Sequence, residues 1–380
     1  MSDLGLTMDT EPRSRRRGKS GGNRGRRKEK RGRSGCAVFL AFAIVIALVA
    51  TGGWYAYGFV KDRFGPPPDY SGTGADGSSV VVVVKTGWVA SQIGNELKRA
   101  GVVKSVDAFT KAYTGDKQQR NIEASAYVLK KHMSAKSAFE FMADRNNRQN
   151  INPGEGFRAN RVFDVIAKKL NVPTADVEAA AKDPSIGLPA WAEGNIEGFL
   201  FPGQYAAAPG MKPVDVLRDM VDTAKTKFVS WELETKAGAI GRKPYDILKI
   251  ASMIQAEVRS AEDMPKVAEV IYNRLNKDMT LGLDSTVNYA LNKSSLQLTQ
   301  AELQTNSPYN TRKVKGLPPT PIGNPGKDAI TAALSPGTGA NLYFVTVNPE
   351  TGETKFTASQ TEFQSFVKEL ETWHKQNPGK

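Results

Sequence analysis

Residues 245–258 read YDILKIASMIQAEV, and this stretch organises the C-terminal half of the chain. Its apolar residues recur every three or four positions, which is the spacing of one helix face. Glu257 falls on the same face, three residues after Ile254 and seven after Ile250. A carboxylate that faces an apolar wall loses hydration, which favours its neutral form and raises its pKa. The stretch therefore predicts a buried helix that carries one inward-facing carboxyl group.

Glu257 has two interpretations at this point. A carboxylic acid that stays protonated near neutral pH can donate a proton to a glycosidic oxygen. A glutamate near a helix end also commonly turns to solvent or forms a structural salt bridge, and for an isolated glutamate these outcomes are the more frequent. The helix alone leaves both open.

The positive charge of the chain is concentrated at its N-terminus. The formal net charge is +13, and residues 1–35 contribute +8 because they hold 12 Lys and Arg against four Asp and Glu. Nucleic-acid-binding domains carry a dense basic patch, which the mildly basic remainder does not offer. We expect residues 1–35 to be a disordered basic tail and expect no nucleic-acid partner.

Residues 36–60 are uncharged and read CAVFLAFAIVIALVATGGWYAYGFV. About 20 apolar residues span a bilayer, and aromatic residues such as Trp54 and Tyr57 favour its interface. A cleaved signal peptide is the alternative, but its apolar region is shorter and precedes a small-residue cleavage site. We expect an uncleaved single-pass helix that binds the membrane, with the basic tail in the cytoplasm and the C-terminal part outside.

The next two segments predict a spacer and a small domain. Residues 61–79 are rich in Pro, Gly and Ser, which is typical of a linker. Residues 80–150 begin with a β-branched run, which predicts a strand, and continue with helices that start at Ser105 and Ser134. This strand–helix–helix plan resembles small glycan-binding LysM modules.

The same plan recurs 69 residues further on, at about residues 151–185. Gly87 and Trp88 correspond to Gly156 and Phe157 without a gap, and apolar helix positions correspond as well. One supersecondary unit used twice explains this match, as does chance similarity between two capped helix pairs.

Few residues are available for metal or nucleophilic chemistry. The chain has one cysteine, Cys36, and two histidines, His132 and His374, which lie far apart in the sequence. The sequence therefore offers few residues for a disulfide framework, a Cys or His zinc site or a Ser-His-Asp triad. We expect no metal and no cofactor, and this narrows the catalytic options to carboxylates.

Four segments after residue 190 combine helices with loops rich in Gly, Pro and Asn, where functional sites tend to lie. They are residues 195–205, the helix that carries Glu257, and the segments that begin at Val267 and Ser307. Besides Glu257, their candidate substrate-binding residues are Glu197, Tyr205, Asn273, Arg274, Asp284, Ser285, Thr286, Tyr309, Asn310 and Thr311.

Two of these residues, Arg274 and Asp284, each have two possible roles. Arg274 falls on the apolar face of its helix and either forms a structural pair or lines a cleft with Asn273. A direct contact with Glu257 would lower the pKa of that glutamate, so we expect Arg274 to face something else. Asp284 either caps a short helix together with Ser285 and Thr286 or is a second catalytic carboxylate.

Together the four segments resemble the endolytic murein transglycosylases of the MltG (YceG-like) family, over about residues 80–375. The chain departs from the family pattern at Gly203 and Gln255, where acidic residues are common. The motifs that carry the resemblance are EGFLFP, ASMIQAE, VAEVIYNRL, LDSTVNYAL, PYNT and GLPPTPIGNPG.

The resemblance implies an α+β fold: a transmembrane helix, a LysM-like module, and a mixed catalytic domain over residues 151–380 that contains the second copy. It implies that Glu257 is the catalytic acid of a bacterial, membrane-anchored lyase. The substrate would be peptidoglycan glycan strands, cleaved between MurNAc and GlcNAc with formation of 1,6-anhydro ends. Peptidoglycan synthases are candidate partners.

Two other functions stay open. One is a hydrolytic muramidase that uses Glu257 and Asp284 together. The other is an anchored peptidoglycan-binding module without catalytic activity.

Overall fold

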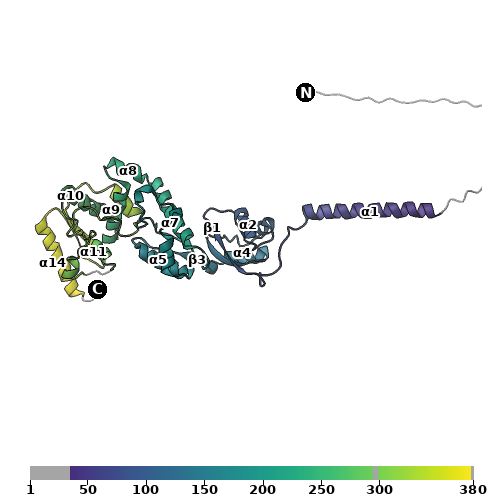
Figure 1. Cartoon of the computed structure of the whole chain (residues 1–380), viewed down its shortest axis with the longest axis horizontal. Helices are drawn as coiled ribbons and strands as arrows, with labels where there is room; N and C mark the ends of the chain where they lie inside the picture. Colours follow the sequence, from purple (N-terminus) through teal and green to yellow (C-terminus); the bar gives the residue numbers. More distant parts are fainter. Residues whose placement is uncertain (1–34, 294–297, 378–380) are drawn as a thin grey trace, which may run out of the picture. The chain divides into compact units, whose positions relative to one another are not determined.

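The computed structural model describes residues 35–293 and 298–377 and divides the chain into two compact units, residues 1–66 and 67–380. In the first unit, helix α1 (Gly35–Phe64) contains a segment, Phe39–Lys61, that is long and apolar enough to cross a membrane (Figure 1). The predicted span, residues 36–60, lies within α1. The predicted basic tail lies outside the described residues, apart from Gly35.

The predicted linker, residues 61–79, is partly folded. The Asp69 carboxylate accepts hydrogen bonds from Ala135 N at 2.9 and 3.1 Å, and Ser105 Oγ donates to Pro68 O at 2.7 Å. Residues 68 and 69 therefore belong to the folded second unit and are not a free spacer.

The second unit begins with a small α/β layer that has its own apolar core. The antiparallel strands β1 and β2 place Val82 opposite Tyr127, and both side chains are fully buried. Ser105 and Ser134 cap α3 and α4 as predicted, because their side chains accept hydrogen bonds from backbone N–H groups of the first turn. The elements are β1 (Ser79–Val84), α2 (Ala90–Arg99), α3 (Val106–Thr114), β2 (Ser125–Lys130) and α4 (Ala135–Ala143).

The segment predicted to be the second copy also folds as a strand followed by two helices. The second strand–helix–helix copy is built from β3 (Arg148–Ile151), α5 (Ala159–Leu170) and α6 (Thr174–Ala180). Gly87 and Gly156 take the same left-handed turn before the helix, with φ of +81° and +74°. Ile93 and its counterpart Val162 are both fully buried. The two copies therefore share a backbone plan and an inward face.

One sheet runs through both copies. It has the order β1-β2-β3-β4, with β4 (Tyr205–Ala206) as its last strand. The pairs β2–β3 and β3–β4 are antiparallel. The predicted boundary between residues 150 and 151 falls inside β3, so the sheet continues across it.

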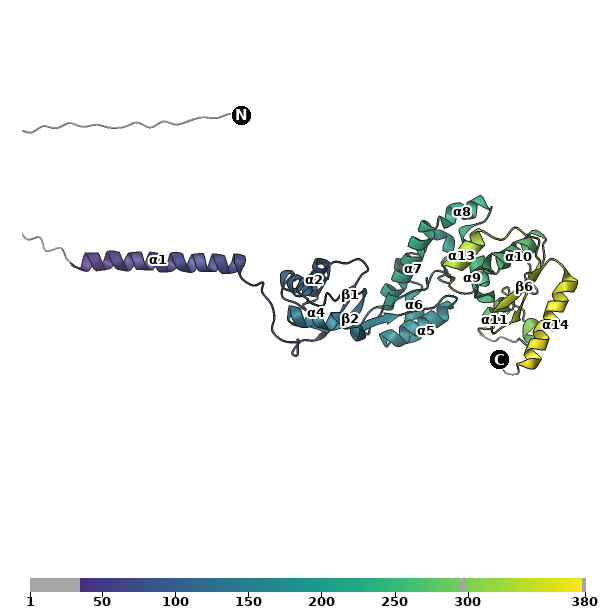
Figure 2. The ribbon, with the colours of Figure 1, turned by 180° about the vertical axis from the view of Figure 1, so that it is seen from behind.

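The rest of the second unit is a helical layer with a C-terminal hairpin, which makes the fold mixed α+β (Figure 2). The helix predicted for residues 245–258 is confirmed as α9, whereas α13 and the hairpin were not predicted. The elements are α7 (Pro213–Ser230), α8 (Leu233–Ala239), α9 (Pro244–Glu257), α10 (Met264–Asn276), α11 (Asp284–Ala290), α12 (Gln300–Leu303), α13 (Lys327–Leu334), β5 (Tyr343–Asn348), β6 (Glu353–Thr357) and α14 (Gln360–Gln376), with short 3₁₀ turns at Arg145–Asn147, Pro184–Ile186 and Ala190–Ala192.

Helix α9 is the centre of this layer. It contacts α8, α10, α11 and α13, and its residues Ile247, Ile250, Ala251 and Ile254 have no exposed surface. Such a helix is held on several sides at once, which fixes the position of the residue at its end. That residue is Glu257.

The Pro-rich loop of residues 307–326 lies against α9. Ser252 Oγ accepts a hydrogen bond from Ile322 N at 3.0 Å, and Gln255 Oε1 accepts one from Gly326 N at 2.9 Å. Proline residues reduce the conformational freedom that the loop loses on folding. The loop and the helix therefore form one rigid support beneath Glu257.

We predict that Gly198→Ala destabilises the protein more than Gly194→Ala does. Both glycines have positive φ, +91° and +75°, and an L-residue there costs about 1–2 kcal/mol. A Cβ on Gly198 would also lie 2.8 Å from Pro321 Cγ, whereas one on Gly194 meets nothing within 4 Å. Overpacking of this kind adds about 1–3 kcal/mol. Urea unfolding of the two variants measures the difference, and equal losses would contradict the close contact.

Candidate active site

Glu257 is the last residue of α9, and the extended backbone of Val258 ends the helix there. Its Oε1 atom is shielded from solvent and has no hydrogen-bond partner among the described residues. Within that part of the chain Glu257 forms no ion pair either. A carboxyl group in this state has lost water without gaining a cation, so its neutral form is favoured.

The pKa of Glu257 is raised, and burial is the main cause. The negative charge of Asp284 raises it further, while the neighbouring hydroxyl and amide of Ser285 oppose the rise. Ser285 Oγ is itself buried and has no partner within hydrogen-bond geometry in the described part of the chain. Two unsatisfied polar atoms thus lie together at the end of α9, which is unusual in a folded protein and common at functional sites.

Glu257 lies in the wall of a groove of about 510 Å³. The start of α5 and the turn before it form one side, and the end of α9 and the start of α11 form the other. Its lining residues are Gly156, Phe157, Arg158, Asn160, Arg161, Asp164, Ala256, Glu257, Asp284, Ser285, Asn288, Asn292 and Ile322.

Glu197 is a second buried carboxyl group with a different environment. Its oxygens accept hydrogen bonds from Ala159 N at 2.9 Å, Tyr289 Oη at 3.1 Å and Asn324 Nδ2 at 3.2 Å. Burial raises its pKa to about 7, against the lowering effect of Tyr289, of the Ala159 and Gly198 amides and of Arg158. Because its oxygens are occupied, Glu197 anchors the first turn of α5 and leaves no free oxygen for a substrate.

Asn324 connects the segments that build the groove wall. Its Oδ1 accepts hydrogen bonds from Gly198 N at 3.0 Å and Leu200 N at 2.8 Å, and its Nδ2 donates to Phe157 O at 2.7 Å. Asn324 is almost fully buried. One side chain therefore joins the turn before α5, the turn after Glu197 and the Pro-rich loop.

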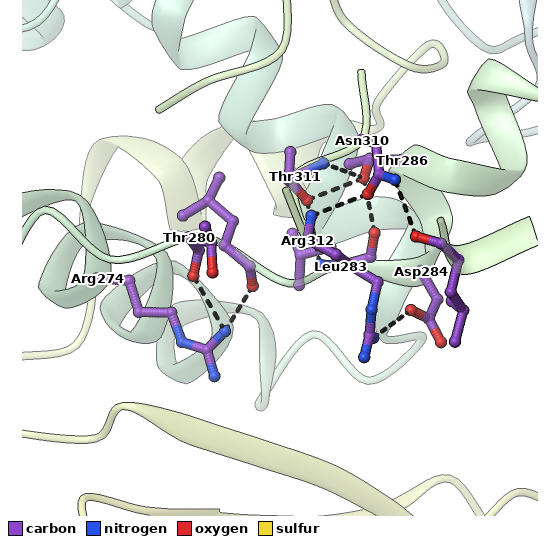
Figure 3. Close-up of polar contacts among 10 residues, drawn as sticks. Arg274, Thr280, Leu283, Asp284, Thr286, Asn310, Thr311 and Arg312 are labelled. Atoms are coloured by element: carbon purple, nitrogen blue, oxygen red, sulfur yellow. Dashed lines mark hydrogen bonds and ion pairs between the residues drawn. The ribbon is translucent and has the colours of Figure 1, made fainter. Parts of the chain in front are cut away.

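Asp284 and Ser285 both line the groove, as their assignment as site residues requires. Asp284 pairs with Arg312 at 2.7 Å on the exposed surface (Figure 3). The interpretation of this segment as a helix cap is wrong, because α11 begins at Asp284 and its N-cap is Leu283, with no side-chain cap. Asp284 is instead a first-turn acidic residue, where the helix dipole favours negative charge.

Thr286, Asn310 and Thr311 have structural contacts beneath the groove (Figure 3). The hydroxyls of Thr286 and Thr311 lie 2.9 Å apart, and Thr286 Oγ1 also donates to Leu283 O at 2.6 Å. Asn310 Nδ2 donates to the carbonyls of Leu303 and Thr305 at 3.0 and 2.8 Å. All three residues are buried and none lines the groove.

Arg274 faces away from Glu257, as expected. Its guanidinium donates to Leu342 O and Leu281 O, each at 2.6 Å, and its contacts to the loop at Thr280 are drawn in Figure 3. Asn273 Nδ2 donates to Asn341 O at 2.9 Å. Both side chains hold the hairpin and its preceding loop, and the groove does not include them.

Tyr205 and Tyr309 also lie outside the groove lining. Tyr205 is buried on β4 and donates to Phe201 O at 2.7 Å. The Tyr309 hydroxyl lies 2.9 Å from Thr320 Oγ1, and its ring contacts that of Tyr289 at 5.0 Å. The structure thus brings Glu257, Asp284 and Ser285 together and places the other candidates around them as supports, with Glu197 facing an adjoining cavity.

Comparison with known proteins identifies the fold family. Residues 82–369 match the sequence profile of the YceG-like family. The chain belongs to the YceG-like family.

Two similar proteins are both named endolytic murein transglycosylase. An endolytic murein transglycosylase of Bacillus subtilis is 29% identical, over 82% of this chain and 88% of the relative. One of Streptococcus pneumoniae is 27% identical, and the chain spans only 61% of its length. The crystal structure of a putative YceG-like protein of Listeria monocytogenes is similar with a TM-score of 0.53 at 25% identity, over 76% of this chain and 99% of that one.

Sequence reasoning missed the groove side that this YceG-like chain builds from α5. Arg158, Asn160 and Arg161 line the groove, and Arg158 Nη1 donates to Asn288 O at 3.3 Å. A signal was present, because the repeat aligns Arg158 and Arg161 with Val89 and Gln92. Only the second copy carries positive charge at these positions.

No group of three or more His, Cys, Asp or Glu in residues 35–293 and 298–377 could hold a metal ion.

We predict that Glu197→Gln removes a pH dependence of stability. The folded-state pKa of Glu197, about 7, is raised above its ordinary value of 4.5, so the folded chain binds the extra proton between these values. The associated stability of about 3 kcal/mol is present below pH 4.5 and is lost as pH rises to about 7 and beyond. Glutamine keeps the shape and the neutral charge of the protonated acid.

Urea unfolding of the full-length protein in detergent at pH 5 and pH 8 measures this effect. The gap between wild type and Glu197→Gln should change by about 3 kcal/mol between the two pH values. Glu193→Gln is the matched control, because Glu193 is exposed and lies four residues away. A gap that is the same at both pH values would contradict the assigned burial.

Proposed function

We propose that this protein is a membrane-anchored endolytic transglycosylase that cleaves peptidoglycan glycan strands between MurNAc and GlcNAc. The observation that carries the proposal is the half-buried Glu257, whose shielded Oε1 atom lies at an open groove without a cation or a hydrogen-bond partner among the described residues. Family membership and the names of the relatives support the substrate class.

The first step uses Glu257 as an acid. The protonated carboxyl group donates its proton to the oxygen that links C1 of MurNAc to GlcNAc, and the C1–O bond breaks as positive charge develops on the MurNAc ring. A raised pKa keeps the proton available near neutral pH. The GlcNAc side leaves with a free hydroxyl group.

The second step uses the same group as a base. The Glu257 carboxylate takes the proton of the C6 hydroxyl of that MurNAc, and O6 bonds to C1 to close the 1,6-anhydro ring. The nucleophile is intramolecular, so neither an activated water nor a second carboxylate is required. The neighbouring Ser285 hydroxyl, which has no hydrogen-bond partner among residues 35–293 and 298–377, would stabilise the carboxylate between the two steps.

The rest of the chain supports a function at the membrane surface. Helix α1 includes an apolar segment suited to a single-pass anchor, and we propose that the basic tail lies in the cytoplasm. The first strand–helix–helix copy would then act as a LysM-like glycan-binding module on the outer side. Enzymes that synthesise the glycan strands are the candidate partners, because they work at the same membrane face.

We predict that Glu257→Gln lowers the cleavage rate by about 10²–10⁴-fold, since it removes the only proposed proton donor. Mass spectrometry of digests by the full-length protein should show 1,6-anhydro ends with wild type and none with the variant. Glu262→Gln is the control, because this exposed glutamate lies five residues away and outside the groove. Reducing ends in place of anhydro ends would falsify the transglycosylase mechanism.

A hydrolytic muramidase would need Asp284 as a second carboxylate. Asp284 lines the groove, but it is exposed and paired with Arg312. This environment favours a role in raising the pKa of Glu257 over a role as the base that activates water.

We predict that Asp284→Asn keeps most of the activity and moves the alkaline limb of the pH–rate profile to lower pH. The sign follows because Asp284 raises the pKa of Glu257, and the acid form is lost earlier without it.

The two mechanisms differ in what this substitution does to the products. Under hydrolysis, Asp284→Asn should lower the rate by about 10²–10⁴-fold and abolish borohydride-reducible ends. Under the proposed mechanism, the products keep their anhydro ends and only the pH profile moves. A protein that pellets with peptidoglycan but releases no fragment at any pH would instead be a binding module.

A further inference from the structure

The groove contains two arginines that the proposed mechanism does not use. Arg158 and Arg161 lie on the α5 side, opposite the end of α9. Neither forms an ion pair within the described part of the chain, whereas Asp284 on the other side is paired with Arg312.

Aromatic rings hold both guanidinium groups at the groove wall. The Arg161 guanidinium lies 3.7 Å from the centroid of the Phe157 ring, and that of Arg158 lies 5.3 Å from the Tyr289 ring. Arg158 is partly buried, and burial lowers its pKa against the opposing effect of Glu197 and Tyr289. Arg158 Nη1 donates to Asn288 O at 3.3 Å, and stacking leaves the remaining N–H groups of both guanidinium groups able to bind a ligand.

Arg158 also lines a second cavity, of about 350 Å³, that adjoins the groove. The two spaces share Arg158, Asn160 and Asn292 in their walls. The volume is within the range of about 300–1,000 Å³ that small-ligand sites occupy. A branch of a bound polymer could therefore leave the groove at Arg158 and enter this cavity.

The internal repeat shows that the fold itself does not need these charges. At the same two positions the first copy has Val89 and Gln92, although both copies share the left-handed glycine turn and the buried helix face. The positive charges are present only in the copy that borders Glu257. Their role therefore belongs to the groove and not to the strand–helix–helix framework.

We propose that Arg158 and Arg161 bind the carboxylates of the peptide stems on the glycan strand. The proposal rests on the proposed function, because only a peptidoglycan strand offers this ligand there. Its GlcNAc and MurNAc rings are uncharged, but each MurNAc carries a lactyl-linked peptide with free carboxylates. Arginine recognises carboxylates with two parallel hydrogen bonds, which gives both affinity and orientation.

The test compares two soluble substrates, glycan strands with stems and the same strands after an amidase has removed the stems. The variants are Arg161→Gln and the double variant Arg158→Val with Arg161→Gln, which restore the residues of the first copy. The control is Lys168→Gln, which removes an exposed charge from α5 two turns after Arg161 and outside the groove. All are assayed as full-length proteins in detergent.

We predict that the double variant lowers kcat/KM on stem-bearing strands by about tenfold or more, mainly through KM, as expected for the loss of charged hydrogen bonds. The loss of kcat/KM on stripped strands should be smaller than the loss on stem-bearing strands, and Lys168→Gln should leave both values unchanged. Equal losses on the two substrates, or no loss on either, would overturn the proposal. Activity on stripped strands also shows that the variant folds.

A binding measurement separates this proposal from the proposed function. In the Glu257→Gln background, fluorescence anisotropy of labelled strands gives Kd without any cleavage. Weaker binding of stem-bearing strands after the arginine substitutions, with unchanged binding of stripped strands, supports the stem site whatever the cleavage products are. Anhydro ends in the digests, together with identical Kd values for the two strands, would support the transglycosylase and refute the stem site.

Discussion

The hydrogen bonds of Asn324 hold the candidate site together. This buried amide binds Glu197, Gly198 and Leu200 across 124 to 127 residues of sequence, and Phe157 across 167 residues. Each bond contributes only about 1 kcal/mol net, but leaving several buried groups unpaired would cost more. Together with Glu197, which accepts a hydrogen bond from Ala159 N, this amide holds the start of α5 that lines the groove.

The two buried carboxyl groups show how environment separates support from chemistry. Burial raises the pKa of both Glu197 and Glu257. Glu197, however, has donors from a backbone amide, a tyrosine and an asparagine, whereas Oε1 of Glu257 has none among the described residues. A saturated carboxyl group fixes structure, while an unsaturated one at an open groove can exchange a proton with a substrate. Desolvation alone would not distinguish them.

The local sequence pattern was enough to predict individual helices and their caps. The periodicity of α9 placed Glu257 on a buried face, and the capping serines marked where α3 and α4 begin. Tertiary contacts were not predictable in this way. Arg274 falls on an inward stripe, yet it binds carbonyls of the loops at Leu281 and Leu342, because the hairpin that supplies one of them had no clear signal. The role of Arg158 likewise depends on α5 facing α11.

The chain departs from the family pattern at Gln255 without losing a structural contact. Gln255 keeps an oxygen that accepts a hydrogen bond from Gly326 N, a contact that a glutamate could also make, so this change leaves the support of α9 intact. The repeat shows the converse, because its buried positions correspond while Arg158 and Arg161 replace Val89 and Gln92 on the free face. Packing fixes the inward face of such a unit, and the outward face is free to change. The second copy can therefore carry the chemistry of a substrate wall on a framework that the first copy uses without charge.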